Sequence, residues 1–308
     1  MSIPSGAQPE PQNPQPQASQ PAPSSPPAQG QQHTVRSIHY TLSYVAQNAE
    51  RGPKGAIVLL HDLPGGAFVW DAVMPPLAGT GRAVYAFDML GFGQSDHPWP
   101  SDTSSWGQAD CLSYALEALN LTEIVLVGHG LGGAVAQVLA TRLARARVAR
   151  LALINSYAYQ HAYAADWPLS DMEKRHDPDL PRQTKLADLI SELRAKVPVA
   201  TTQPIGQARL DAYSNEWNSH VGLEMLYQHI RLMKPDYINA VASDVKALQI
   251  PIMLLWGGRD QVTPPALGQR IAAENPHATF QRITEAGHLI LDDAAPAVAQ
   301  ALSEFAAR

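Results

Sequence analysis

The chain has 308 residues, of which 45% are hydrophobic, and its formal net charge is −6 at pH 7. This length suits one large domain with an insertion, or two smaller domains. The acidic balance argues against nucleic acid or an anionic membrane as a partner, and no apolar run approaches the ~18 residues of a membrane-spanning helix. The single cysteine, Cys111, excludes an internal disulfide. We therefore expect a cytoplasmic protein that binds a small molecule.

The first part of the chain has the composition of a disordered tail. Residues 1–33 hold nine prolines and eight glutamines, and Glu10 carries their only side-chain charge. Such a segment buries too little apolar surface to offset the entropy lost on ordering. It also lacks the basic start and apolar core of a secretory signal. We expect folding to begin near residue 34.

Alternating strands and helices follow the tail. A loose alternation over 35–45 predicts a hairpin, and helical patterns occupy 68–77, 104–119, 134–140, 266–274 and 296–306. Largely apolar runs predict strands over 56–60, 83–87, 124–127, 148–154 and 251–255, and we expect a last strand over 279–283. This order predicts an α/β fold with a mostly parallel, doubly wound sheet that is covered on both faces.

Residues 157–245 interrupt the alternation with a mostly helical pattern. We expect this segment to form a helical cap over the carboxyl ends of the strands, where a substrate pocket is commonly found. The core would then consist of residues 34–156 and 246–308.

A glycine-rich turn follows the predicted strand 124–127. Gly128, Gly130 and Gly132 occupy the first, third and fifth positions of a nucleophile elbow, G-x-S-x-G, between a strand and a helix. The third position normally carries the nucleophile, but Gly130 has no side chain. A dinucleotide-binding loop is the alternative, but the G-x-G-x-x-G spacing and the acidic residue that should follow it are missing.

Five stretches follow one another along the chain: LLHDLPGGAFVW, AFDMLGFGQSD, VLVGHGLGG, LLWGGRDQVTP and EAGHLILDD. In this order they resemble the α/β-hydrolase family, from about residue 36 to the end of the chain. Within that family the chain is most similar to the capped branch of haloalkane dehalogenases, epoxide hydrolases and carbon–carbon bond hydrolases.

The resemblance implies a catalytic pair, Asp260 and His288. Each follows a predicted strand, in the family's order of nucleophile, acid and histidine. A histidine that acts as a general base needs one tautomer, and a carboxylate on its far nitrogen selects it. A turn aspartate and a loop histidine are the structural alternatives for the two residues taken singly.

The resemblance also implies an oxyanion hole made of two backbone N–H groups, those of Leu63 and Leu131, with His61 bracing the first loop. Asp62 departs from the family, which usually has glycine there. A carboxylate that pointed inward would oppose developing negative charge, so we expect Asp62 to point outward as a turn residue. His61 and His129 do not suggest a metal site, because no acidic or thiol ligand lies at a useful spacing. We expect no cofactor.

Three functions remain open. In the first, the Asp260–His288 pair works without a nucleophile at Gly130, as a hydrolase or as a histidine-base lyase or cofactor-free oxygenase. In the second, the protein is a non-catalytic member that binds a ligand. In the third, Gly130 replaces serine or aspartate in an ordinary hydrolase. The retained pair favours an enzyme acting on a small, largely apolar substrate.

Overall fold

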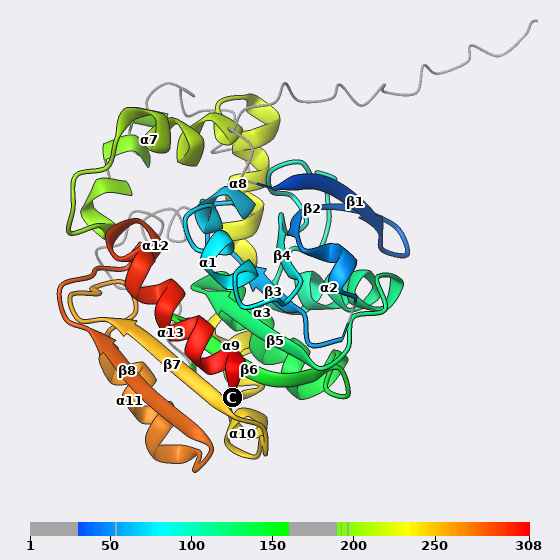
Figure 1. Ribbon diagram of the computed structural model, residues 1–308. Helices are drawn as coiled ribbons and strands as arrows, with labels where there is room; N and C mark the ends of the chain where they lie inside the picture. Colours follow the sequence, from blue (N-terminus) through cyan, green and yellow to red (C-terminus); the bar gives the residue numbers. More distant parts are fainter. Residues whose placement is uncertain (1–29, 53, 160–189, 192, 196) are drawn as a thin grey trace, which may run out of the picture.

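The computed structural model describes residues 30–52, 54–159, 190–191, 193–195 and 197–308. Within these residues eight strands form one sheet in the order β1-β2-β4-β3-β5-β6-β7-β8 (Figure 1). The strands are β1 (Gln31–Arg36), β2 (Thr41–Gln47), β3 (Ile57–Leu60), β4 (Val84–Phe87), β5 (Ile124–His129), β6 (Val148–Ile154), β7 (Ile252–Gly257) and β8 (Ala278–Ile283). β2 pairs antiparallel with β1 and with β4, and the other neighbours are parallel. The predicted mostly parallel α/β sheet is confirmed.

Strand pairing is present three residues before the predicted start of the fold. Gln31 already pairs with Ala46 of β2, although residues 31–33 were assigned to the tail. β1 is an edge strand with largely exposed side chains, so backbone pairing holds it without an apolar pattern. The rest of the predicted tail, residues 1–29, lies outside the described residues.

Helices cover the sheet on both faces. α1 and α13 contact each other and lie in front of the sheet in Figure 1, whereas α11 lies behind it. α2 packs against α3, the helix that follows β5. These helices are α1 (Met74–Ala78), α2 (Ser105–Ala118), α3 (Leu131–Val138), α11 (Pro265–Glu274), α12 (Ile290–Asp293) and α13 (Ala295–Ala307).

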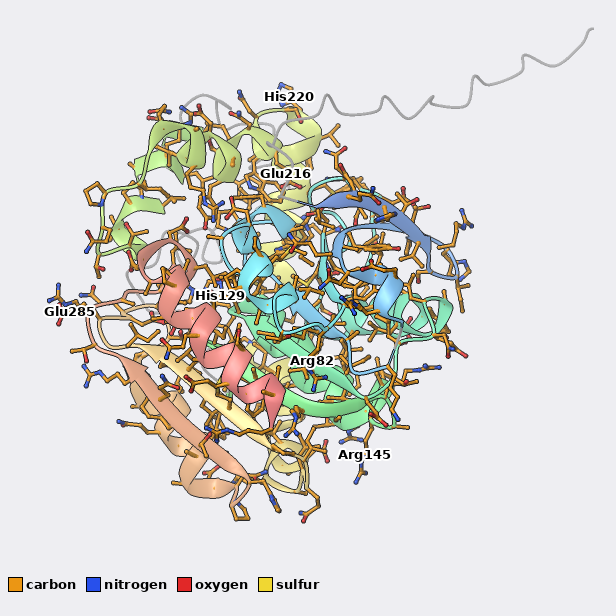
Figure 2. All side chains as sticks on the ribbon, viewed as in Figure 1. Arg82, His129, Arg145, Glu216, His220 and Glu285 are labelled. Atoms are coloured by element: carbon orange, nitrogen blue, oxygen red, sulfur yellow. The ribbon has the colours of Figure 1, made fainter. Side chains whose placement is uncertain are left out.

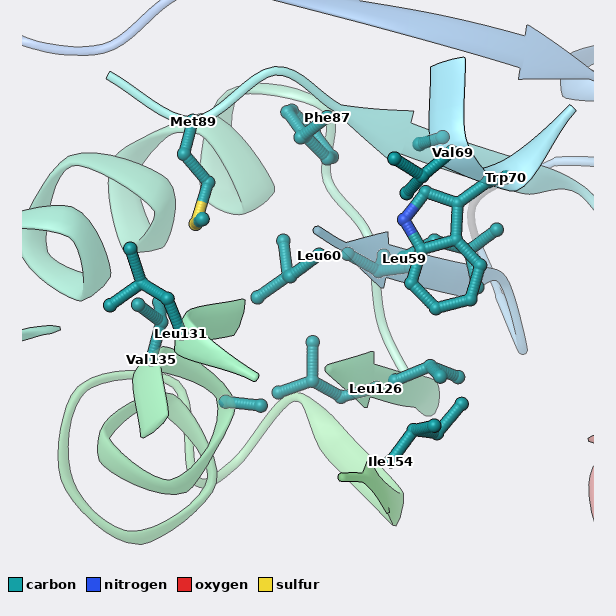
Figure 3. Close-up of a cluster of buried hydrophobic side chains, with 14 of the residues drawn as sticks. Leu59, Leu60, Val69, Trp70, Phe87, Met89, Leu126, Leu131, Val135 and Ile154 are labelled. Carbon is teal, nitrogen blue, oxygen red and sulfur yellow. The ribbon is translucent and has the colours of Figure 1, made fainter. Parts of the chain in front are cut away.

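The core explains the unbroken apolar runs of the central strands. Leu60 of β3, Leu126 of β5 and Ile154 of β6 are buried together with Trp70, and Leu131 of α3 packs beside them (Figure 3). A parallel sheet that is covered on both faces has no solvent side, so successive residues are apolar. Each such side chain contributes about 1.5–3 kcal/mol when fully buried. The packed sheet gives the loops at its carboxyl edge a rigid base.

One predicted helix is shorter than expected. The pattern over 68–77 folds as a 3₁₀ turn, Ala67–Trp70, followed by the short helix α1. Pro75 and Pro76 explain the break, because proline has no N–H to donate within a helix and is tolerated only in its first turn.

The described residues from 197 to 246 are mostly helical. They contain α7 (Gln207–Ser214), α8 (His220–Leu232), α9 (Pro235–Asn239) and α10 (Ala242–Lys246), with α7 and α8 at the top of Figure 1, beyond the ends of the strands. Residues 160–189, 192 and 196 of the predicted cap lie outside the described residues, so the division into core and cap stays a prediction. Among the described helices, none is both long and apolar enough to cross a membrane.

Candidate active site

The predicted turn after β5 is present. The chain turns at Gly130, with φ 52° and ψ −114°, and enters α3 at Leu131. A residue with a Cβ adopts a positive φ only at a cost, and glycine adopts it freely. The Gly130 carbonyl accepts hydrogen bonds from the N–H groups of Gly133 and Ala134, at 3.1 and 3.2 Å, and so starts the helix. The elbow is therefore intact in its backbone and has no nucleophilic side chain.

The predicted outward orientation of Asp62 is wrong. Its side chain is 3% exposed and points at the elbow. Oδ1 accepts the Leu131 N–H at 2.6 Å, and Oδ2 accepts a hydrogen bond from His288 Nε2 at 2.9 Å. Burial alone raises the pKa of Asp62, but the hydrogen bond and charge of His288, with the Leu131 N–H, hold this pKa below its usual value. These partners offset the desolvation of the carboxylate, which is why it stays inside.

Asp62 occupies the space in which a side chain at position 130 would stand. An ideal Cβ built on Gly130 would lie less than 3.0 Å from all three atoms of the Asp62 carboxylate group. Real Cβ atoms do not approach other atoms so closely. A nucleophile at position 130 and the observed Asp62 therefore exclude each other, and the two departures from the family pattern form one feature.

His288 joins two carboxylates. It lies between β8 and α12, with Nδ1 2.9 Å from Asp260 Oδ2 and Nε2 2.9 Å from Asp62 Oδ2. Burial lowers the pKa of His288, but the charge and hydrogen bond of Asp260, then those of Asp62, outweigh it and raise the pKa to about 10. At neutral pH both ring nitrogens donate, so the resting site is carboxylate–imidazolium–carboxylate. The structure thus brings the two predicted residues together and adds a third.

The predicted oxyanion donors have different surroundings. The Leu131 N–H is already paired with Asp62, and Leu63 lies buried in the same loop as Asp62. His61 holds that loop: its Nδ1 lies 3.0 Å from the Asp62 carbonyl oxygen, and its Nε2 accepts the Met89 N–H at 3.1 Å. An oxyanion role for Leu63 and Leu131 stays a prediction.

Two positioning residues escaped the sequence analysis. Asn155, directly after β6, donates from Nδ2 to the His288 carbonyl at 2.8 Å and accepts the Gly257 N–H at 2.8 Å. Thr263 donates from Oγ1 to Asp260 Oδ2 at 2.6 Å. The position of Asn155 at the carboxyl end of a buried strand was the available signal, because the polar groups of a parallel sheet gather there.

The reason given against a metal site is also wrong. Ligand atoms of Asp62, His129 and His288 lie within 4.8 Å of one another, and Figure 2 shows His129 in the interior of the molecule. These groups are engaged, however: both His288 nitrogens face carboxylates, and His129 Nε2 donates to the His288 carbonyl at 2.8 Å. A metal would have to displace these hydrogen bonds, so the donor set fits a proton network better than a metal.

A charged cluster ties α7 to the site loops. Arg209 of α7 donates from Nε to Asp292 Oδ1 at 2.6 Å and from Nη1 to the Phe68 carbonyl at 2.9 Å. Tyr213 of the same helix donates to Asp292 Oδ2 at 2.5 Å. Asp292 lies in α12, directly after His288, so α7 is fastened to the segment that carries the histidine.

A family model and several proteins of known name are similar to this chain in sequence. A family model described as alpha/beta hydrolase fold matches residues 55–295. A cis-3-alkyl-4-alkyloxetan-2-one decarboxylase of Shewanella oneidensis is 26% identical over 267 residues, which cover 81% of each chain. A 2-hydroxymuconate semialdehyde hydrolase of Pseudomonas sp. is 26% identical over 241 residues, covering 77% of this chain and 81% of the relative.

Solved structures show the same architecture. A haloalkane dehalogenase from Bradyrhizobium elkani superposes with a TM-score of 0.77 at 20% identity, covering 90% of this chain and 97% of that protein. At this identity the likeness concerns the fold.

Proposed function

Because the chain belongs to the α/β-hydrolase fold family, we propose that it is a hydrolase of a small, largely apolar substrate, in which His288 transfers protons and Asp260 orients His288. The observation that carries this proposal is the buried His288 ring, bonded to Asp260 on one side and aimed across the elbow on the other. Burying one imidazolium between two carboxylates costs several kcal/mol per ion in desolvation. Strongly shifted ionisable groups of this kind cluster at functional sites. The relative named as a 2-hydroxymuconate semialdehyde hydrolase supports the same reaction class.

The roles of the pair follow from their contacts. Asp260 holds His288 Nδ1 and is itself fixed by the N–H groups of Val262 and Thr263, at 2.8 and 2.9 Å. His288 is charged at rest, so it first serves as a hydrogen-bond donor or an acid. It becomes a base only after the charge on Asp62 has been neutralised.

A second candidate is a protein that binds a ligand without turning it over. Asp62 pairs with both the elbow N–H and the histidine, and it is almost fully buried. A site whose polar groups are already paired with one another is typical of a protein that does not catalyse a reaction. The third alternative, an ordinary hydrolase with a substituted position 130, conflicts with the packing, because a side chain there collides with Asp62.

Turnover of three substrate classes tests the proposal. The wild-type protein is incubated with 4-nitrophenyl acetate, 1-bromobutane and 1,2-epoxybutane, and hydrolysis is followed. His288→Ala is expected to lower the turnover of any accepted substrate by about 10²–10⁴-fold, the usual contribution of a general acid–base. The matched control is His277→Ala, an exposed histidine that bonds Gln249 away from the site. Unchanged turnover in a folded His288→Ala protein would refute the proposed pair. Tight binding of apolar ligands without any turnover would favour the second candidate.

A further inference from the structure

We propose that Asp62, on the loop after β3, is the nucleophile of this site and attacks a saturated carbon to form an alkyl ester on its own carboxylate. This inference rests on the proposed function and deepens it by naming the nucleophile and the substrate class. The elbow strand delivers nothing at Gly130, and a carboxylate from the neighbouring strand's loop stands in the same space.

Position is the first argument. The Asp62 carboxylate lies over the elbow, beside the start of α3, and within hydrogen-bond distance of the histidine. A nucleophile needs this proximity to its base, which the family normally obtains from position 130. The loop itself is fixed, because the Asp62 carbonyl accepts the Gly65 N–H at 2.8 Å and bonds His61 Nδ1 at 3.0 Å. The position of Asp62 is therefore fixed by hydrogen bonds of its backbone carbonyl as well as by those of its carboxylate.

The occupied elbow N–H selects the substrate class. Acyl transfer to a hydroxyl nucleophile needs the Leu131 N–H for the oxygen of the substrate carbonyl. Here this N–H already binds Asp62 Oδ1 at 2.6 Å, so it serves the oxygen of the enzyme's own carboxyl group. Attack on a saturated carbon requires no oxyanion on the substrate. The geometry thus favours a carbon that bears a halide or belongs to a strained epoxide ring over an ester or amide carbonyl.

The chemistry balances with water alone. Oδ2 of Asp62 forms a bond to the substrate carbon, and the bond to the leaving group breaks, with its electron pair departing as halide or as the epoxide oxygen, which takes the His288 proton. After a halide has left, His288 Nε2 first releases its proton to solvent, because the Asp62 charge that held it is gone; after epoxide opening, that proton is already on the substrate oxygen. A water molecule then attacks Asp62 Cγ and gives a proton to His288, and the negative charge forms on Oδ1, beside the Leu131 N–H. The Cγ–Oδ2 bond breaks, and Oδ2 takes the proton from His288 and leaves as part of the alcohol. Asp62 keeps one oxygen from water, and its remaining proton returns to His288, which restores the carboxylate and the imidazolium.

The contact between Asp62 and His288 makes the histidine an acid before alkylation and a base after it. While Asp62 is ionised, its charge and hydrogen bond help to hold His288 protonated. Alkylation removes that charge, so the pKa of His288 falls and Nε2 becomes able to accept a proton. The histidine therefore turns into a base only when an ester is present to be hydrolysed.

Trapping the ester tests the inference. His288→Gln keeps an N–H that can face Asp62 but removes the base of the second half. This variant is incubated with 1-bromobutane or 1,2-epoxybutane and analysed by intact mass and peptide mapping. We expect one added alkyl group on the peptide that contains Asp62, and none in the Asp62→Asn/His288→Gln protein. In otherwise wild-type protein, Asp62→Asn should lower turnover by at least about 10³-fold, because the nucleophile is lost. Asp110→Asn, at an exposed carboxylate on α2, is the matched control.

The possible failures are distinguishable. Turnover by the wild-type protein without an adduct on Asp62 in the trapping variant would overturn the inference and leave the proposed hydrolase standing. Hydrolysis of 4-nitrophenyl acetate alone would do the same, because it requires acyl transfer. Absence of both turnover and adduct with every substrate would overturn the inference and the proposed function together. The peptide map of His288→Gln shows whether Asp62 carries the alkyl group even if Asp62→Asn fails to fold.

Discussion

Replacing Gly130 by alanine would push a methyl group into the Asp62 carboxylate. The Cβ would lie less than 3.0 Å from three carboxylate atoms, so Asp62 must move away from Leu131 and His288. In an Asp62→Gly protein the three atoms nearest to this methyl group are absent. We therefore predict that Gly130→Ala destabilises the wild-type protein much more than it destabilises Asp62→Gly.

The free-energy cost of Gly130→Ala has two contributions. The positive φ at Gly130 costs about 1–3 kcal/mol for any residue with a Cβ, and this cost is the same in both backgrounds. Moving Asp62 also breaks two charge-assisted hydrogen bonds, each contributing about 1.5–3 kcal/mol, and this happens only when Asp62 is present. The coupling free energy between the two positions should therefore reach at least about 2 kcal/mol.

Urea unfolding of the wild-type protein, the two single variants and the double variant measures this coupling. Gly81→Ala is the control for backbone strain, because Gly81 has φ +81° and no atom within 4 Å of its ideal Cβ. It should cost about 1–3 kcal/mol whether or not Asp62 is present. Additive free energies for Gly130→Ala and Asp62→Gly would refute the packing on which the site's interpretation depends.

Two further predictions concern charge. Because folding raises the pKa of His288 to about 10, its stabilisation is complete below the unfolded pKa, near 6.5, and is lost as the pH rises through 10. The difference in unfolding free energy between wild type and Asp62→Asn should accordingly shrink from about pH 6 to about pH 10, and a constant difference would contradict the ion pair. Glu216 lies in the 3₁₀ turn Asn215–Trp217 before α8, and its buried side chain accepts the Gly93 N–H at 2.5 Å. Changing Glu216 to alanine should lower the free energy of unfolding in urea by about 3 kcal/mol. Lys54→Ala removes an exposed ion pair and should lower the free energy of unfolding by no more than about 1 kcal/mol. An equal loss of stability in the two variants would argue that the buried Glu216 side chain does not hold Gly93 in place.

Much of the fold was predictable from local patterns. The strands β3, β4, β5 and β7 are largely apolar and fully buried because their sheet is covered on both faces, and the glycines after β5 mark the sharp turn before α3. The resemblance to the α/β-hydrolase family implied the pair Asp260 and His288, and the structure brings the two side chains together because both follow strands whose carboxyl ends meet at one edge.

The orientation of Asp62 could not be predicted in the same way. Local turn chemistry favours an aspartate that faces solvent, and nothing near residue 62 in the sequence opposes it. The space it enters is created by the missing side chain of Gly130, on a different strand's turn. Its charge is offset by Leu131 and His288, which are equally remote in sequence. Side-chain direction here depends on tertiary packing, so each departure from the family pattern is explained only by the other.

The oxygen atoms of a single turnover test the central claim most directly. Excess wild-type protein is mixed with 1-bromobutane in water enriched in oxygen-18, and both the alcohol and the peptide containing Asp62 are analysed by mass spectrometry. If Asp62 carries the ester, the first alcohol released contains ordinary oxygen, taken from the carboxylate, and Asp62 gains one heavy oxygen. If a water activated by His288 attacks the substrate directly, the alcohol is labelled at once and Asp62 stays unlabelled, and the assignment of Asp62 as nucleophile is then contradicted.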